Sequence, residues 1–182
     1  MKNNIILVGM MGAGKTYTGK ALKEQLPQMT LIDIDEYIEK SQNMKISEIF
    51  EKYGEKYFRD LETNAIKELT QNENQIISTG GGSFEKEENR NTLNQNGYTI
   101  YLKAPANVLF ERIKDEAHRP LLQQGFGSEK IEEILLKREH NYEKAHIIID
   151  TAQKSKYNII EEVLKRINNY AEQGGSWNWR KK

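Results

Sequence analysis

The chain has 182 residues, with 27 basic and 27 acidic side chains and no cysteine. This length suits one domain with a proper hydrophobic core, and the balanced charge gives no net field that would draw the protein to nucleic acid or to an anionic membrane. Without cysteine the chain forms neither disulfides nor thiolate zinc sites, and without an export signal or a membrane-length apolar run we expect it to be cytoplasmic.

The first predicted elements are a strand at about 4–8, a glycine-rich loop and a helix at about 15–25. The loop reads GMMGAGKT at residues 9–16 and matches the P-loop pattern G-x-x-x-x-G-K-[ST]. Its glycines let backbone N–H groups turn toward phosphate oxygens, and the following helix adds its positive dipole end. A βα turn without a ligand would not need Lys15 and Thr16 at these spacings. The pattern therefore predicts that a nucleotide binds here, with Lys15 at the terminal phosphates and Thr16 at Mg²⁺.

A second short strand is predicted at 29–32, and it ends in Asp33-Ile34-Asp35. In an extended chain residues i and i+2 point to the same side, so we expect the two carboxylates to lie together. They would then lie at the carboxyl edge of the sheet, where open α/β proteins bind their ligands. On the residues alone, a polar ending to a strand remains an equal alternative.

Two amphipathic helices are predicted next, at 46–53 and 57–69, with Gly54 as the interruption between them. The second helix carries Arg59 and Glu62 three residues apart, and therefore on one side. An isolated pair with this spacing is most often a surface ion pair, which leaves its role open. The expected buried stripe of this helix comprises Tyr57, Phe58, Leu61, Ala65 and Leu69.

A third strand is predicted at 75–79, and it runs directly into Gly80-Gly81-Gly82. Three successive glycines remove every side chain, so the backbone there can come very close to a ligand. A helix at about 86–94 and a strand at 98–102 follow. Pro105 then suits the first turn of the next helix, which carries Arg112.

From 115 to 127 the regular pattern breaks down, which indicates a mobile loop around Arg119. Ser128 is predicted to be the N-cap of a helix that reaches Tyr142. Arg138 lies on the apolar stripe of this helix, where a charge is costly unless it is paired. A strand at 146–150, a helix from about 157 to 170 and a tail at 173–182 complete the chain.

Strands thus alternate with helices along the whole chain. Such alternation predicts an α/β fold, with a parallel sheet that helices cover on both faces. No internal repeat and no domain-sized linker interrupts it, so we expect a single domain over residues 1–172.

Taken together, the motifs resemble those of the shikimate kinase family. They occur in the order P-loop, Asp33-x-Asp35, Phe58-Arg59-x-x-Glu62, Gly80-Gly81-Gly82, Arg119-Pro120-Leu121-Leu122 and Arg138-x-x-x-Tyr142. The resemblance implies a P-loop kinase fold with strand order 2-3-1-4-5, a substrate-binding region at about 33–62 and a lid at about 115–127. It also implies that a monomer transfers the γ-phosphate of ATP to the 3-hydroxyl of shikimate, in aromatic amino-acid biosynthesis.

The same resemblance implies which residues bind shikimate. Arg59 and Arg138 would bind its carboxylate, a task that suits the fixed fork of a guanidinium, and Glu62 would orient Arg59. Backbone N–H groups of Gly80, Gly81 and Gly82 would hold substrate oxygens. Asp35 would grip the ring hydroxyls near the reacting oxygen and act as general base if its geometry allows.

On the ATP side, the resemblance implies that the phosphates lie on Gly12, Ala13, Gly14, Lys15, Thr16 and Tyr17. Asp33 would hold Mg²⁺ beside Thr16, and Arg112 would stack on the adenine. Lys15 and Arg119 would stabilise the charge of the transferring phosphoryl group, and the closing lid that carries Arg119 would exclude water. Tyr17 departs from the family pattern, which has a small residue here, so only its backbone N–H would serve the α-phosphate.

Other functions remain as alternatives. A gluconate kinase would bind a different polyol with a different carboxylate clamp, and a nucleoside monophosphate kinase would need a second base pocket. A regulatory GTPase would carry D-x-x-G and N-K-x-D motifs, and this sequence has neither. A catalytically inactive nucleotide-binding module is disfavoured by the intact set Lys15, Thr16, Asp33, Asp35 and Arg119.

Overall fold

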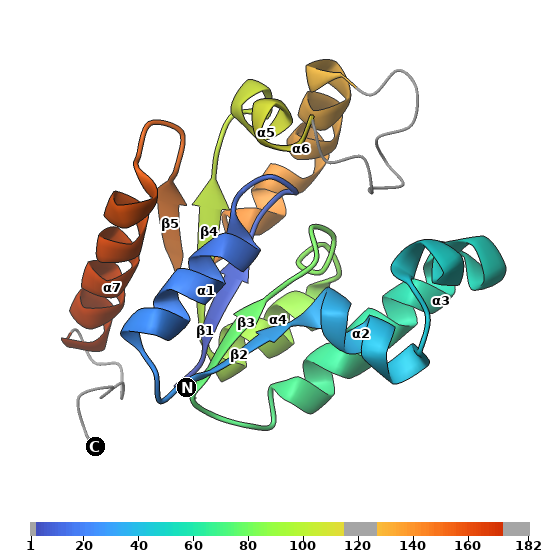
Figure 1. The fold of residues 1–182 in the computed structure, drawn as a ribbon, viewed down its shortest axis with the longest axis horizontal. Coiled ribbons are helices and arrows are strands. Elements are labelled where there is room, and N and C mark those ends of the chain that lie inside the picture. Colours follow the sequence, from blue (N-terminus) through green and yellow to red (C-terminus); the bar gives the residue numbers. More distant parts are fainter. Residues whose placement is uncertain (1–2, 115–126, 173–182) are drawn as a thin grey trace.

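The protein folds around a five-stranded parallel sheet, seen in a computed structural model that describes residues 3–114 and 127–172 (Figure 1). The strand order is β2-β3-β1-β4-β5, which confirms the expected order. All four neighbouring pairs are parallel. The strands are β1 (Ile5–Val8), β2 (Thr30–Asp33), β3 (Gln75–Ser78), β4 (Tyr98–Lys103) and β5 (Ile147–Asp150).

Helices cover both faces of this sheet. Helices α1 and α7 contact each other on one face, while α4 packs on the other and is covered in turn by α3 (Figure 1). Helix α5 lies against α6 beyond the carboxyl end of β4. The helices are α1 (Lys15–Gln25), α2 (Ile34–Gln42), α3 (Ile46–Leu69), α4 (Glu87–Asn96), α5 (Ala106–Ile113), α6 (Ser128–Tyr142) and α7 (Lys156–Glu172).

The central strands explain why the core forms where it does. Every residue of β1 and β3 is buried, and β1 consists entirely of the apolar run Ile5-Ile6-Leu7-Val8. A strand covered on both faces needs such a continuous apolar run, because neither side of it meets water. Burial of these side chains fixes the centre of the sheet and leaves its carboxyl edge free for polar groups.

The strand order brings three functional segments together at that edge. In the central register Leu7 lies beside Ser78, and Ser78 lies beside Asp33. The chain leaves these three neighbouring strands into the P-loop, the triple glycine and the first turn of α2. Parallel strands that end side by side therefore place the phosphate loop next to both candidate acceptor-site segments.

The sequence did not predict helix α2, and Asp35 belongs to this helix and not to the preceding strand. The strand ends at Asp33, whose side chain caps α2 by accepting a hydrogen bond from the Asp35 backbone N–H at 3.1 Å. Asp35 thus lies in the first helical turn, and the extended i, i+2 geometry expected for the two carboxylates is wrong. An aspartate that caps a helix ends the strand, because its side chain replaces the missing backbone acceptor.

Two smaller expectations also need correction. The N-cap of α6 is Gly127, and Ser128 is the first helical residue. Tyr57 was expected to be buried, but it is 39% exposed. The interruption at Gly54 is confirmed, because this residue breaks α3 with φ 80° and ψ 171°.

Other expectations concern segments outside the described residues. Residues 115–126, which hold nearly all of the expected lid, and the tail at 173–182 are among these. In the part of the chain that the structure describes, no helix is both long and apolar enough to cross a membrane.

Candidate active site

The phosphate-binding loop has the backbone that its glycines predict. Gly12 and Gly14 have φ values of 77° and 90°, in the left-handed region that glycine adopts without strain. A Cβ on Gly12 would also lie only 2.8 Å from the carbonyl oxygen of Leu109. Gly14 is the N-cap of α1, so the helix begins at Lys15 and directs its positive end into the loop.

Lys15 is buried over this loop. Its Nζ donates hydrogen bonds to the carbonyl oxygens of Gly9 at 2.8 Å and Met10 at 3.0 Å. These carbonyls fix the ammonium group at the centre of the loop. A positive charge placed there is ready for the terminal phosphates of a nucleotide.

A cleft extends from the loop toward α5 and the start of α7. It contains every residue from Met11 to Thr18, together with Lys20, Arg112, Lys154, Ser155 and Ile159. The structure thus places Arg112 beside the P-loop, as expected, although the two lie almost 100 residues apart in sequence. Tyr17 lines the same cleft with an exposed ring, and the residues after Asp150 complete the outer wall.

Arg112 is held in this cleft by backbone and hydroxyl groups. Its Nη2 donates to the Thr151 carbonyl at 2.7 Å, and its Nη1 donates to the Thr151 hydroxyl at 3.1 Å. Nη1 also lies 3.4 Å from the Gly12 carbonyl. Burial lowers the pKa of Arg112 from its usual value, and these acceptors hold the planar guanidinium in place. A fixed planar cation is suited to stack on an aromatic base.

Thr16 and Asp33 form the polar link between the P-loop and β2. The Thr16 hydroxyl donates to Asp33 Oδ2 at 3.0 Å, while Oδ1 of Asp33 caps α2. Both are hard oxygen ligands, which is the type that Mg²⁺ prefers. Among the described residues no group of three or more histidine and acidic side chains could hold a metal ion. The residues present therefore fit an ion held by one or two protein oxygens, with phosphates and water as its other ligands.

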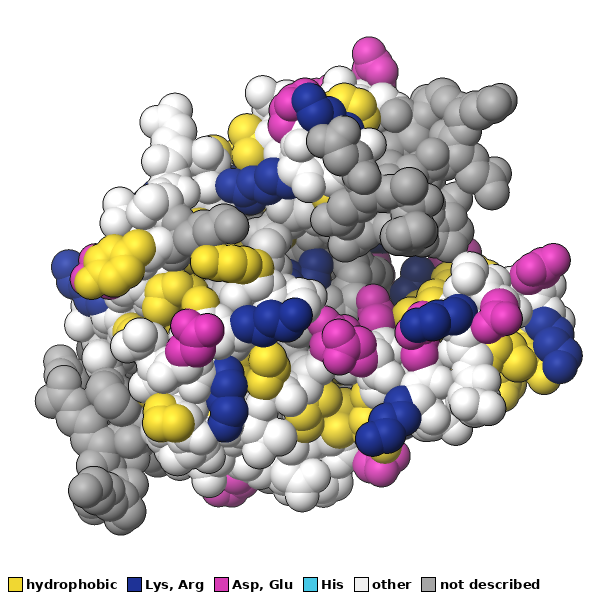
Figure 2. All heavy atoms as spheres, viewed as in Figure 1, with side chains coloured by type: hydrophobic (Ala, Val, Ile, Leu, Met, Phe, Trp, Pro, Cys, Tyr) yellow, Lys and Arg dark blue, Asp and Glu magenta, His cyan; other side chains and the backbone are white. Residues whose placement is uncertain are grey.

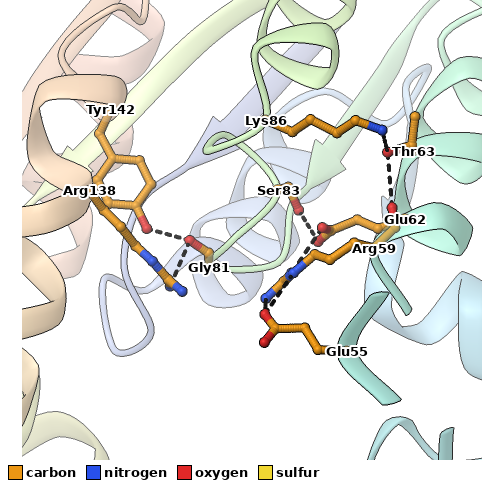
Figure 3. Close-up of polar contacts among 9 residues, drawn as sticks. All are labelled: Glu55, Arg59, Glu62, Thr63, Gly81, Ser83, Lys86, Arg138 and Tyr142. Carbon is orange, nitrogen blue, oxygen red and sulfur yellow. Dashed lines mark hydrogen bonds and ion pairs between the residues drawn. The ribbon is translucent and has the colours of Figure 1, made fainter. Parts of the chain in front are cut away.

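On the opposite side of the P-loop, α3 carries Arg59 with two carboxylates. Its Nη1 donates to Glu62 Oε2 at 3.0 Å, and Nε and Nη2 donate to Glu55 Oε1 at 3.2 and 3.1 Å (Figure 3). Burial alone would lower the pKa of Arg59, but Glu62 and Glu55 together raise it above its usual value. Glu62 is buried and accepts a second hydrogen bond from the Ser83 hydroxyl at 2.5 Å. The sequence pointed to Arg59 and Glu62 but not to Ser83 or Glu55.

The triple glycine allows the backbone to approach these side chains. A Cβ on Gly80 would lie 2.9 Å from both Asp35 Oδ1 and Glu62 Oε1. The structure thereby brings the predicted residues Asp35 and Glu62 to one glycine, although they come from different helices. Any side chain at residue 80 would collide with a carboxylate.

Gly81 is anchored by two residues of α6. Its carbonyl oxygen accepts hydrogen bonds from Arg138 Nη1 at 3.3 Å and from the Tyr142 hydroxyl (Figure 3). Tyr142 is fully buried and stacks on Tyr101 with ring centroids 5.0 Å apart. Burial raises the pKa of the Tyr142 hydroxyl, so it remains a hydrogen-bond donor. The i, i+4 spacing of Arg138 and Tyr142 in their shared motif places both side chains on one face of α6, where they reach the same carbonyl oxygen.

Arg59 and Arg138 approach the same space from opposite sides. Figure 3 shows their guanidinium ends turned toward each other, with the triple-glycine segment between α3 and α6. Both side chains line a cleft with Glu55, Glu62, Gly82, Glu85, Lys86 and Asn89. Figure 2 shows charged side chains of both signs deep in a hollow beside α3. Two guanidinium groups facing one space make a strong site for a carboxylate.

Nearly all of the residues singled out from the sequence thus lie at one edge of the sheet. The exception is Arg119, which is outside the described residues. The P-loop and Arg112 line one cleft, whereas Arg59 and Arg138 line another, to which Gly82 of the triple glycine contributes. An arrangement with a phosphate-binding loop and a second cleft that holds two guanidinium groups can bring a nucleotide and an acidic acceptor together.

Known proteins resemble this chain in sequence and in fold. A family model described as shikimate kinase matches residues 11–168. Shikimate kinases of Thermodesulfovibrio yellowstonii and Persephonella marina are 44% and 43% identical to the chain, and the matches cover 89% and 90% of it and 93% and 98% of the relatives.

Solved structures agree with this match. A shikimate kinase from Acinetobacter baumannii in complex with shikimate superposes with a TM-score of 0.87 and 37% identity, covering 93% of this chain and 95% of that one. A gluconokinase from Sinorhizobium meliloti reaches a TM-score of 0.55 at 14% identity over 94% and 95% of the two chains, and so shares the fold alone. The chain belongs to the shikimate kinase family.

Proposed function

We propose that this ATP-dependent kinase transfers the γ-phosphate of ATP to the 3-hydroxyl of shikimate in the space between the P-loop and the two arginines. The observation that carries the proposal is the position of Arg59 and Arg138, which face each other beside the triple glycine. The relative from A. baumannii has been solved in complex with shikimate, a small ring with one carboxylate. A pair of guanidinium groups would bind that carboxylate and leave the ring hydroxyls pointing toward the P-loop.

The acceptor is then positioned by the groups around the glycines. Glu62 fixes Arg59 and is itself fixed by Ser83, so the guanidinium cannot rotate freely. Backbone N–H groups of Gly80, Gly81 and Gly82 hold substrate oxygens. Asp35, which lies against Gly80, grips the hydroxyls nearest the P-loop and serves as general base for the attacking oxygen.

We propose that Mg²⁺ is held by Thr16 and Asp33 when ATP is bound. Their oxygens already lie 3.0 Å apart beside the phosphate loop, and they fit an ion that takes its other ligands from phosphate and water. The ion would supply positive charge to the β- and γ-phosphates. Thr16 also bridges the P-loop to β2, so it keeps the two sides of the site in register.

Charge stabilisation of the transferring group falls to Lys15 and Arg119. Lys15 exchanges its two backbone acceptors for phosphate oxygens, to which the same N–H donors bind more strongly. Arg119 is assigned from its motif and would enter with the lid over 115–127. Gly12, Ala13, Gly14 and the backbone N–H of Tyr17 cradle the phosphates, and Arg112 stacks on the adenine.

An ADP-release assay with ATP and Mg²⁺ tests the function. Shikimate should be phosphorylated, whereas gluconate and nucleoside monophosphates should not be. Gluconate is the informative comparison, because the gluconokinase shares the fold of this chain. Turnover with gluconate instead of shikimate would contradict the substrate assignment.

We also propose that residues 1–172 act as one domain of a cytoplasmic monomer. Light scattering at assay concentration tests whether the protein is a monomer.

A further inference from the structure

Arg59 binds two carboxylates of its own helix in very different ways. Glu62 is 1% exposed and is held at its other oxygen by Ser83, so it is a fixed part of the site. The side chain of Glu55 is 65% exposed, and it lies in the first turn after the kink at Gly54. One of its oxygens accepts from both Nε and Nη2 of Arg59.

This contact occupies the edge of Arg59 that a substrate carboxylate would use. Nη1 is already bound to Glu62, and the flat guanidinium lies against Gly82, whose Cβ would come within 2.9 Å of it. The Nε and Nη2 atoms together present two parallel N–H donors, and their only described partner is the exposed Glu55 carboxylate. This edge of Arg59 can therefore bind a carboxylate through two hydrogen bonds. Figure 3 shows the Glu55 carboxylate at the end of Arg59 that faces Arg138.

We propose that Glu55 is a built-in competitor for the shikimate carboxylate, and that it lowers the affinity of the acceptor site for shikimate. This inference rests on the proposed function. When the acceptor is absent, Glu55 holds Arg59 in its binding position. When shikimate enters, its carboxylate takes the Nε–Nη2 edge and Glu55 turns into solvent.

The charges on Arg59, Glu55 and Glu62 favour this exchange. Glu62 and Glu55 together outweigh the single positive charge of Arg59, and a third carboxylate at the same guanidinium would be repelled. Release of Glu55 removes that repulsion. Breaking the Glu55–Arg59 contact costs little free energy, because an exposed ion pair four residues apart on a helix is weak.

The exchange requires a carboxylate on the acceptor. A ring polyol without one has no group that can replace Glu55 on Arg59, so it leaves the Glu55 contact in place. Shikimate replaces the weak internal contact with one that Arg138 also shares.

The test is the substitution Glu55→Gln, which keeps the shape of the side chain but removes its charge. We expect the dissociation constant of shikimate, measured by calorimetry without nucleotide, and the KM for shikimate to fall by about two- to fivefold, as suits the loss of one weak exposed ion pair. The KM for ATP should stay the same. Asp60→Asn is the matched control, because it removes another exposed four-residue pair of α3, that with Lys56 at 3.0 Å.

A double-mutant cycle with Arg59→Ala separates this role from a general charge effect. In the Arg59→Ala background, Glu55→Gln should no longer strengthen shikimate binding, because the contact has gone. Weaker shikimate binding by Glu55→Gln would mean that Glu55 only positions Arg59, and it would overturn the inference. Equal strengthening by Asp60→Asn would do the same. A wild-type protein that turns over no shikimate would instead refute the proposed function, which the wild-type assay reveals by itself.

Discussion

The guanidinium of Arg59 lies directly against the backbone of Gly82, so closely that a Cβ at residue 82 would stand 2.7 Å from Nη1 and 2.8 Å from Nη2. Arg59 of α3 and Gly82 of the triple glycine, more than 20 residues apart in sequence, can thus pack this closely only because residue 82 has no Cβ. The third glycine of the motif therefore has a steric role, in addition to the backbone hydrogen bonding proposed for it. The position of Arg59, the arginine proposed to bind the carboxylate, depends on this glycine.

Gly82→Ala should displace Arg59 and weaken acceptor binding. We expect the KM for shikimate to rise about tenfold, as a weakened charge-assisted hydrogen bond would require, while the KM for ATP changes little. Steady-state kinetics with each substrate varied in turn provides the measurement. Gly81→Ala is the steric comparison, since its Cβ would meet nothing closer than 3.5 Å, and it should have the smaller effect. The opposite order would show that the Gly82–Arg59 contact does not control binding.

Arg138→Ala should weaken shikimate binding far more than ATP binding. Arg138 holds the Gly81 carbonyl and faces Arg59, so its removal takes away one of the two cations proposed for the carboxylate. A loss of about ten- to a hundredfold in shikimate affinity is expected for a charged hydrogen-bond partner. Calorimetry with each substrate alone measures the two dissociation constants, and these are compared between Arg138→Ala and the wild type. Equal losses for ATP and shikimate would indicate that Arg138 only supports the fold.

The sequence predicts the sheet and the loops that meet at its edge, but not the side-chain contacts between them. Alternation of strand and helix patterns predicts the sheet, and the parallel carboxyl ends predict that Asp33, the P-loop and the triple glycine meet. Helix α2 was missed because it begins within two residues of a strand end, where the capping side chain of Asp33 is decisive and periodicity is not. Contacts such as Gly82–Arg59 and Glu55–Arg59 depend on rotamers and on the packing of α3 against the glycines, which spacing along the chain does not fix.

The protein should lose stability as the pH falls from about 7 to 5, and His146 should contribute to this loss. Its Nδ1 accepts a hydrogen bond from the Thr99 backbone N–H at 3.2 Å. The Thr99 hydroxyl accepts from the His146 backbone N–H at 3.1 Å and donates to Asn94 Oδ1 at 2.6 Å. Burial lowers the pKa of His146 in the folded protein. Below about pH 6.5 the unfolded chain therefore takes up a proton before the folded chain does, which favours unfolding.

Urea unfolding at several pH values tests this assignment. The free energy of unfolding should fall less steeply with decreasing pH in His146→Gln than in the wild type. His140→Gln, which changes an exposed histidine, should keep the wild-type slope. A wild-type slope in His146→Gln would assign the acid sensitivity to other groups.

Lys15→Ala should abolish most of the turnover while leaving the fold intact. Lys15 contributes a fixed positive charge at the phosphate loop, and loss of one such preorganised group lowers kcat by about a hundred- to a thousandfold in other enzymes. The substitution also frees the carbonyls of Gly9 and Met10, which the ammonium group now binds. Circular dichroism and thermal unfolding must therefore accompany the single-turnover measurement. If the Lys15→Ala protein is folded, binds shikimate normally and reacts slowly, Lys15 acts in the chemical step. A folded Lys15→Ala protein with a near-native rate would contradict the assignment of the P-loop as the site of phosphoryl transfer.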